Sequence, residues 1–169
     1  MKTSLRVGLP VLLFSTMLFS CSKDNRNVPL QIMLTDNPAA YDSVNVHILD
    51  VKIKMNKDDA GWTDLNAKDT TVNLLDLQNG TTLLLSQDTI PDGVLKEVRF
   101  ILGNDNYVVV DGVRHELVAP SAEDAGLKIK VDKHLNETLN TFVLDFDAAL
   151  SIKEQNGSYK LMPVIKLKP

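Results

Sequence analysis

Four aspartates supply the best set of ligands for a hard cation in this sequence. Asp36 and Asp42 bracket a turn, and Asp145 and Asp147 stand two residues apart in a segment that alternates apolar and polar residues. Residues i and i+2 of a strand point to the same face, about 6.5–7 Å apart. Ca2+ takes about six to eight oxygen ligands, from carboxylates and carbonyls. These aspartates are therefore candidate Ca2+ ligands, and no other cofactor is expected.

The same aspartates also have a simpler explanation as surface charge. Lys128 and Lys130 occupy the outward face of the segment that precedes Asp145 and Asp147. Opposite charges on neighbouring strands stabilise each pair by roughly 0.2–1 kcal/mol. Asp36 follows an alternating segment and precedes Asn-Pro, a position where aspartate caps turns. We favour surface charge and turn capping over a metal site.

Trp62 is the only tryptophan and the candidate ligand-binding aromatic. Its flat apolar face, next to a glycine turn, could stack on one side of a pyranose ring. The alternative, which we favour, is that Trp62 covers one end of a core that is short of aromatic residues. Tripeptides that begin at Asp42, Asp69 and Asp88 also resemble the Asp-Ser/Thr-hydrophobic sites that some gut-type bacteria O-glycosylate.

No catalytic signature is present in the sequence. His47, His115 and His134 lie in three separate segments, without the i, i+4 spacing of a zinc protease helix. The chain has no Gly-x-Ser-x-Gly nucleophile elbow and no Gly-rich phosphate loop. We therefore expect a protein that is not an enzyme.

Cys21, the only cysteine, predicts covalent attachment of lipid. Lys2 and Arg6 form a basic start, and the apolar stretch Val7–Phe19 is shorter than the roughly 20 residues that span a bilayer. The sequence Leu-Phe-Ser-Cys that ends at Cys21 resembles a lipobox, in which the thiol is acylated and the cysteine becomes the first mature residue. The alternative is an ordinary secretory signal followed by an incidental free thiol.

These features divide the chain into three parts. Residues 1–20 are predicted to be a lipoprotein signal peptide, 21–27 the lipidated cysteine with a polar tether, and 28–169 a single domain. Several acyl chains on Cys21 would hold the protein stably on a membrane. We expect the protein in the cell envelope, on the outer membrane of a Gram-negative bacterium. The sequence does not decide between the periplasmic face and the cell surface.

Charge narrows the range of partners. The chain has a net charge of −4, and the signal segment holds two of its positive charges, which leaves about −6 for the remainder. An acidic protein is a poor match for nucleic acid, so no nucleic-acid partner is expected. Acidic and basic residues are interspersed along the sequence. An envelope protein or a glycan is the expected partner.

The candidate residues above lie in or next to segments in which apolar and polar residues alternate, which is the pattern of a β-strand. Residues 28–34 form one such segment, and in 44–55 the phase changes near Leu49-Asp50, which predicts a bulge. Asp111-Gly112 between two apolar runs predicts a tight hairpin. Residues 159–167 form a last strand that Pro163 interrupts. The pattern predicts an all-β fold, an antiparallel Greek-key β-sandwich of immunoglobulin-like or prealbumin-like type.

Several segments, taken in order, resemble an uncharacterised bacterial and archaeal family, domain of unknown function 4382 (DUF4382). The segments that carry the resemblance are Leu34–Pro38, Val44–Val51, Trp62, Leu74–Gly80, Ile90–Gly93, Val98–Phe100, Pro120-Ser121, Gly126–Ile129, Leu144–Asp147 and Pro163–Ile165. The resemblance implies a β-sandwich on envelope lipoproteins and brings no catalytic residue.

The leading hypothesis for function is a non-enzymatic, lipid-anchored envelope protein with an interaction or adhesion-type sandwich. The alternative is a ligand-binding module for a glycan or Ca2+ at the cell surface.

Overall fold

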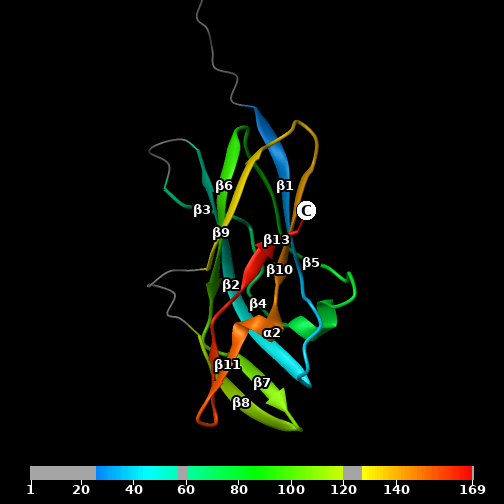
Figure 1. Cartoon of the computed structure of the whole chain (residues 1–169). Helices are drawn as coiled ribbons and strands as arrows, with labels where there is room; N and C mark the ends of the chain where they lie inside the picture. Colours follow the sequence, from blue (N-terminus) through cyan, green and yellow to red (C-terminus); the bar gives the residue numbers. More distant parts are fainter. Residues whose placement is uncertain (1–25, 57–60, 120–126, 169) are drawn as a thin grey trace, which may run out of the picture.

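The protein folds into two β-sheets that pack face to face (Figure 1). This computed structural model describes residues 26–56, 61–119 and 127–168. The predicted signal peptide, Cys21 and most of the tether lie outside the described residues, as does the predicted loop at 120–126. Within the described ranges, no helix is both long enough and apolar enough to cross a membrane.

The small sheet has the strand order β13-β10-β1-β5. Its strands are β1 (Asn27–Thr35), β5 (Leu83–Pro91), β10 (Asn140–Phe146) and β13 (Ile165–Leu167). β1 runs parallel to β10 and antiparallel to β5, and β13 pairs antiparallel with the end of β10. β1 therefore lies in the interior of its sheet, with a neighbour on each side.

The large sheet has the order β11-β12-β8-β7-β2-β6-β9, and two short strands, β3 and β4, also pair with β2. Its strands are β2 (Ser43–Met55), β3 (Thr63–Asp64), β4 (Thr70–Asn73), β6 (Val94–Leu102), β7 (Tyr107–Val110), β8 (Val113–Val118), β9 (Leu127–His134), β11 (Ile152–Gln155) and β12 (Ser158–Leu161). A 3-10 helix, η1 (Leu74–Leu77), and one α-helical turn, α2 (Ala148–Ser151), complete the described fold.

The core lies between the two sheets and follows the predicted alternation. Leu30, Ile32 and Leu34 of β1 are at most 1% exposed, and Val51 and Ile53 face them from the large sheet at 0%. Burying side chains of this size stabilises the fold by about 1.5–3 kcal/mol each.

The predicted bulge in 44–55 is confirmed. The pairing of β2 with β6 shifts register between Ile48 and Asp50, at the point where the sequence changes phase. One extra residue, Leu49, is left exposed, and both halves of β2 direct their apolar side chains inward. The bulge thus reconciles the two phases within one long strand.

The predicted Asp-Gly hairpin is also confirmed. Asp111 and Gly112 join β7 to β8 with φ angles of 50° and 75°, the two positive values that a type I′ turn requires. Asn156 and Gly157 join β11 to β12 in the same way, with φ angles of 52° and 73°.

The all-β sandwich is confirmed, but its sheets are mixed. β1 and β10 pair in parallel, as do β8 and β12. The expected last strand over residues 159–167 is in fact two strands, because β12 belongs to the large sheet and β13 to the small one. Pro163 lies in the crossing. It has no N–H for a ladder, so the chain leaves one sheet there and joins the other.

The sandwich has two long seams where the edges of its sheets meet. At the closed seam, an antiparallel bridge joins Ala67, between β3 and β4, to Ser86 of β5. The Asn66 N–H also donates to Asp88 Oδ2 at 3.1 Å. At the open seam, β9 lies near β13, and no backbone hydrogen bond joins these two strands in the part of the chain that the structure describes.

Candidate functional site

Three of the four candidate Ca2+ ligands come together at one end of the small sheet. Asp36 directly follows β1, and Asp145 is the residue that pairs with Thr35 in the neighbouring strand β10. Because β1 and β10 are parallel, their ends lie side by side. Asp147 comes just after β10 and caps α2, its Oδ1 accepting from the Leu150 N–H at 3.0 Å.

The backbone and Asn37 already engage part of this carboxylate cluster. Asp36 is 2% exposed, and its Oδ1 accepts from the Ala148 N–H at 2.9 Å. Asn37 Nδ2 donates to Asp145 Oδ2 at 2.8 Å. Asp36 Oδ2 and Asp145 Oδ1 are buried without a partner among the described residues. Burial above all, together with the charges of Asp145 and Asp147, raises the pKa of Asp36 from 3.8 to about 6, although backbone N–H groups of Ala148 and Asn37 act to lower it.

Asp42 lies in different surroundings. It is exposed, and its Oδ2 accepts from the Gly112 N–H at 2.8 Å, so it braces the β7–β8 turn. Across the described ranges, no group of three or more His, Cys, Asp or Glu side chains is placed to hold a metal ion. A Ca2+ site at Asp36, Asp145 and Asp147 stays a prediction, and Asp42 does not join their cluster.

The expected pairing of these aspartates with Lys128 and Lys130 is wrong. β9, which carries both lysines, pairs with β6 in the large sheet, whereas β10 belongs to the small sheet. The residue opposite Asp145 is Lys166 of β13. β9 and β10 follow each other in sequence but belong to different sheets, so their outward side chains do not meet.

Basic residues from three strands instead gather on the outer side of the large sheet. We call this surface the basic face. It is formed by the outward residues of β2, β6 and β9, namely Lys52, Lys54, Glu97, Arg99, Lys128 and Lys130. The register places Lys52 opposite Arg99 and Arg99 opposite Lys128, so three cations form one row across the strands.

Acidic groups offset only part of this charge. Lys52 contacts Asp50 at 3.7 Å and forms a closer ion pair with Asp64, whose hydrogen bond raises the pKa of Lys52. Asp132 lies 2.7 Å from the Lys96 ammonium and 3.0 Å from that of Lys130, and these bonds lower the pKa of Asp132.

The remaining cations of the face are less well balanced. Lys54, Arg99 and Lys128 form no ion pair with any residue that the structure describes. Local positive charge therefore persists on a chain of net charge −4.

Trp62 lies on this basic face. The guanidinium carbon of Arg99 is 4.0 Å from the centre of the Trp62 ring, which is a cation–π contact. Arg99 is the middle cation of the row, and its Nε is buried without a partner in the described ranges. Trp62 is half-buried against this side chain and lies outside the hydrophobic core. The structure therefore does not support the interpretation of Trp62 as a cover for one end of the core.

The three histidines lie in separate places. His47 Nε2 is 2.7 Å from Asp69 Oδ1, and the His47 ring packs so closely on Gly103 that a Cβ there would overlap it. The His115 ring is 4.8 Å from that of Tyr159.

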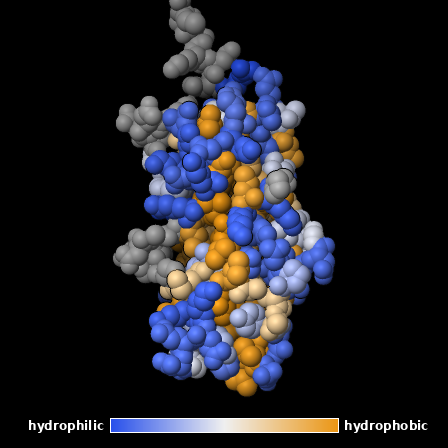
Figure 2. Space-filling view, viewed as in Figure 1, coloured by the Kyte–Doolittle hydropathy of each residue, from blue (hydrophilic) through white to orange (hydrophobic). Residues whose placement is uncertain are grey.

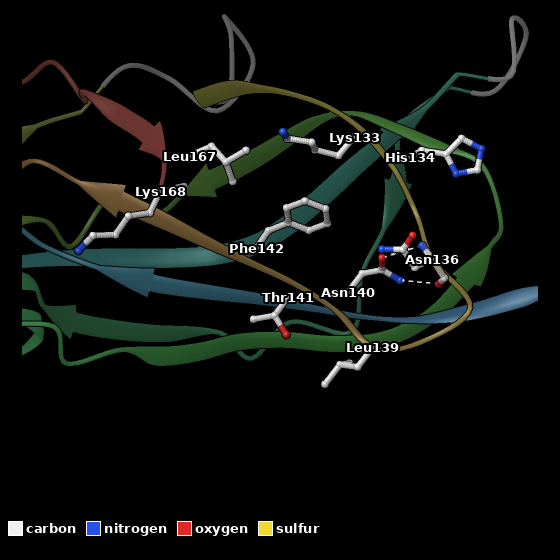
Figure 3. Close-up of a pocket in the computed structure, with 9 residues that line it drawn as sticks. All are labelled: Lys133, His134, Asn136, Leu139, Asn140, Thr141, Phe142, Leu167 and Lys168. Atoms are coloured by element: carbon white, nitrogen blue, oxygen red, sulfur yellow. Dashed lines mark hydrogen bonds between the residues drawn. The ribbon is translucent and has the colours of Figure 1, made fainter.

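His134 lines a groove of about 570 Å³ at the open seam (Figure 3). The lining comes from β9, the loop that follows it, β10 and the end of β13: Lys133, His134, Asn136, Leu139, Asn140, Thr141, Phe142, Leu167 and Lys168. Thr141 and Phe142 point to opposite sides of β10 in Figure 3. Hydrophobic residues gather along the middle of this side of the molecule, between hydrophilic residues (Figure 2).

A family model described as "Domain of unknown function (DUF4382)" matches residues 27–163. The chain belongs to the DUF4382 family. The resemblance expected from the sequence segments is thereby confirmed. No curated protein and no solved structure matches the chain significantly.

The match locates the candidate sites within this DUF4382 domain. Its range, 27–163, includes Trp62, the basic face and the carboxylate cluster, and it ends before β13. The groove therefore lies partly outside the matched range, since Leu167 and Lys168 line it.

Sequence reasoning missed the basic face and the groove of this DUF4382 domain. The basic residues of the face alternate with apolar residues in three strands, a signal that becomes visible only once β2, β6 and β9 are known to be neighbours. The groove is formed by segments that include residues 133–142 and 167–168, and no local pattern links them.

Proposed function

We propose that this protein is a non-enzymatic, lipid-tethered envelope protein whose sandwich is an adhesion-type module that binds an anionic glycan on its basic face. The observation that carries the proposal is the row Lys52–Arg99–Lys128 with the Trp62 ring stacked on its middle member. The tether rests on the lipobox-like sequence at Cys21.

The row is unfavourable in the free protein. Like charges directly opposite each other on neighbouring strands are destabilising. Asp50 and Asp64 contact the first cation of the row, Lys52, and no described acidic residue forms an ion pair with Arg99 or Lys128. An anionic ligand would offset this repulsion, so the row of cations favours binding of an anion.

The aromatic residue favours a sugar over a simple anion. An acidic sugar carries a carboxylate or sulfate for the cations and C–H groups for an indole face. Trp62 and Arg99 are already in contact. The sugar ring and its acidic group would therefore be bound side by side. The envelope location expected from Cys21 would place such polymers within reach.

The test is binding of the full chain in detergent to polygalacturonate, with neutral dextran as the control polymer. Replacement of Lys54 and Lys128 by Glu should weaken binding about tenfold or more, which corresponds to roughly 1.4 kcal/mol. Trp62→Ala should weaken it as well, and added salt should weaken the wild type.

The matched control is Lys153→Glu. Lys153 is exposed on β11, at the other end of the strand order of the large sheet, and the substitution makes the same charge change. Equal loss in the Lys153 variant, or equal binding of dextran, would show that the basic face is not a glycan site.

The tether has its own test. The intact mass of the native protein should show a chain that begins at an acylated Cys21, and Cys21→Ser should release the protein from membranes. Protease treatment of intact cells then distinguishes the cell surface from the periplasmic face of the membrane, since cleavage without lysis requires surface exposure.

A further inference from the structure

We propose that the groove at the open seam receives an extended, acidic segment of a partner protein, which pairs as an added strand with the first half of β10. This site is separate from the basic face and does not rest on the glycan proposal. Three features of the groove support it: an unpaired strand edge, an apolar lining and a cationic rim.

The first feature is the short length of β13. It pairs only with Leu144–Phe146 of β10, and the Lys168 N–H adds one bond to the Val143 carbonyl at 2.8 Å. In the described part of the chain, no strand lies beside Asn140–Phe142 on that side. Alternate residues of a strand direct their backbone groups to the same edge, so Thr141 presents its N–H and C=O beyond the end of β13.

An unpaired strand edge is a template for another chain. The position of the groove matches this gap, because Thr141 and Phe142 line it on one side and the end of β13 closes it. An added segment would continue the line of β13 along the edge of β10.

The second feature is the apolar lining. Phe142 and Leu167 belong to the inward faces of β10 and β13, yet both remain partly exposed because no strand covers them at the open seam. Leu139, on the other side of the β10 edge, is 50% exposed. A strand places alternate side chains on opposite faces, so one residue of the added segment would pack on Phe142 and the next near Leu139.

The third feature is charge. Lys133, His134 and Lys168 line the groove, and none of the residues that line it is acidic. Glu137, in the adjoining loop, forms an ion pair with Arg26. The positive rim therefore calls for Asp or Glu beside the apolar residues of the partner, and it disfavours a basic segment.

The groove is also held in shape before any partner arrives. Asn140 Nδ2 donates to the carbonyls of Asn136 at 3.0 Å and Thr138 at 2.9 Å, and its Oδ1 accepts from the Asn136 N–H at 2.9 Å. A further bond from Nδ2 to the Pro29 carbonyl, at 3.1 Å, ties the loop to β1. Such preorganisation lowers the entropic cost of binding.

The test uses the full chain in detergent and the synthetic peptide acetyl-Asp-Val-Glu-Val-Asp-Val-Glu-amide. NMR shift changes should centre on the amides of Thr141, Phe142 and Lys168. The peptide with Lys in place of each acidic residue should not bind. Replacement of Lys133 and Lys168 by Glu should weaken binding about tenfold or more, whereas Lys166→Glu, which reverses an exposed charge on β13, should leave it nearly unchanged.

Strand pairing is tested on both partners. Thr141→Pro removes the N–H that the added strand needs and should abolish binding. If this variant does not fold, the same peptide with an N-methyl group on every residue gives the answer, because it keeps its charges and has no N–H for pairing at either edge. Equal binding of the N-methylated peptide, shift changes away from β10, or displacement of the peptide from the groove by polygalacturonate would overturn the proposal.

Discussion

The two seams of the sandwich differ in the hydrogen bonds that cross them. At the closed seam, the Thr35 hydroxyl donates to the carbonyls of Leu77 and Thr81 at 3.0 and 2.8 Å, and the Asp36 N–H donates to Leu77 as well. At the open seam, β9 and β13 share no backbone hydrogen bond in the described ranges, and a groove separates their polar groups. Backbone pairing therefore bridges the closed seam, although Ser86 Oγ stays buried there without a partner among the described residues, and no such pairing bridges the open seam in the described ranges.

The comparison shows how one sandwich can separate stability from binding. η1 extends from the closed seam and buries Leu74 and Leu77 beneath it. The open seam leaves Phe142 and Leu167 partly exposed. We therefore expect truncation of the buried leucines at the closed seam to cost more stability than truncation of the partly exposed Phe142 or Leu167, which should mainly change recognition.

The largest effect should come from Leu74→Ala. Leu74 is 0% exposed in η1, and truncation of a fully buried leucine costs about 2–5 kcal/mol. Leu167→Ala at the open seam should cost less, about 1 kcal/mol, because its side chain is already partly exposed. Urea unfolding of both variants measures the difference. Equal losses would remove the distinction between the seams.

The next effect concerns Asp36, which links β1 to η1. Its pKa is raised from 3.8 to about 6 in the fold, so the folded state binds the proton more tightly than the unfolded chain. Stability from this group is therefore present below about pH 4 and is lost as the pH rises to about 6.

Asp36→Asn should isolate this contribution. Asparagine keeps the acceptor for the Ala148 N–H and does not ionise. Its stability relative to wild type should rise by up to roughly 3 kcal/mol between pH 4 and pH 7, and then stay level. Unfolding curves across this range provide the measurement, and a constant difference between the two proteins would contradict the raised pKa.

A smaller loss is expected for Asn140→Ala at the open seam. The substitution leaves three backbone carbonyls and the Asn136 N–H without their side-chain partner, which should cost about 1–3 kcal/mol. The matched control is Asn136→Ala, since the side chain of Asn136 is exposed. Thermal unfolding should separate the two variants. If they match, the loop is not held by Asn140.

The smallest effect should follow Asp132→Asn at the β9 edge. Asp132 has a φ of 50°, which asparagine also tolerates, and its ion pairs with Lys96 and Lys130 are exposed. The stability change should stay below about 1 kcal/mol. Binding of polygalacturonate should increase, because one negative charge leaves the basic face. A decrease in binding would argue against this face as the site.

Features with a local cause could be predicted from the sequence. The phase change near Leu49 located the bulge, and Asp111-Gly112 located a hairpin, because each depends on residues adjacent in the chain. The choice of sheet could not be predicted in this way. It depends on long-range packing, which sent β12 and β13 to different sheets around Pro163 and separated β9 from β10.

The same reason explains the outcome for the candidate sites. Asp36 and Asp145 are candidate ligands by their chemistry, and the parallel pairing of β1 with β10, which the sequence does not predict, brings them together. Trp62 was chosen as an aromatic near a turn, whereas its contact with Arg99 depends on a strand more than 30 residues away. Acylation of Cys21 stays a prediction, since this residue lies outside the described ranges.

The position of β1 has a mechanical consequence. The strand begins at the end of the molecule opposite the β7–β8 hairpin (Figure 1), and it lies between β5 and β10. A pull on Asn27 along the strand must slide β1 against both neighbours at once, so many backbone hydrogen bonds share the load. A segment paired to β10 would pass its own load to β1 within the same sheet. Tension from such a segment would thus pass along the small sheet to the start of β1 without separating the two sheets.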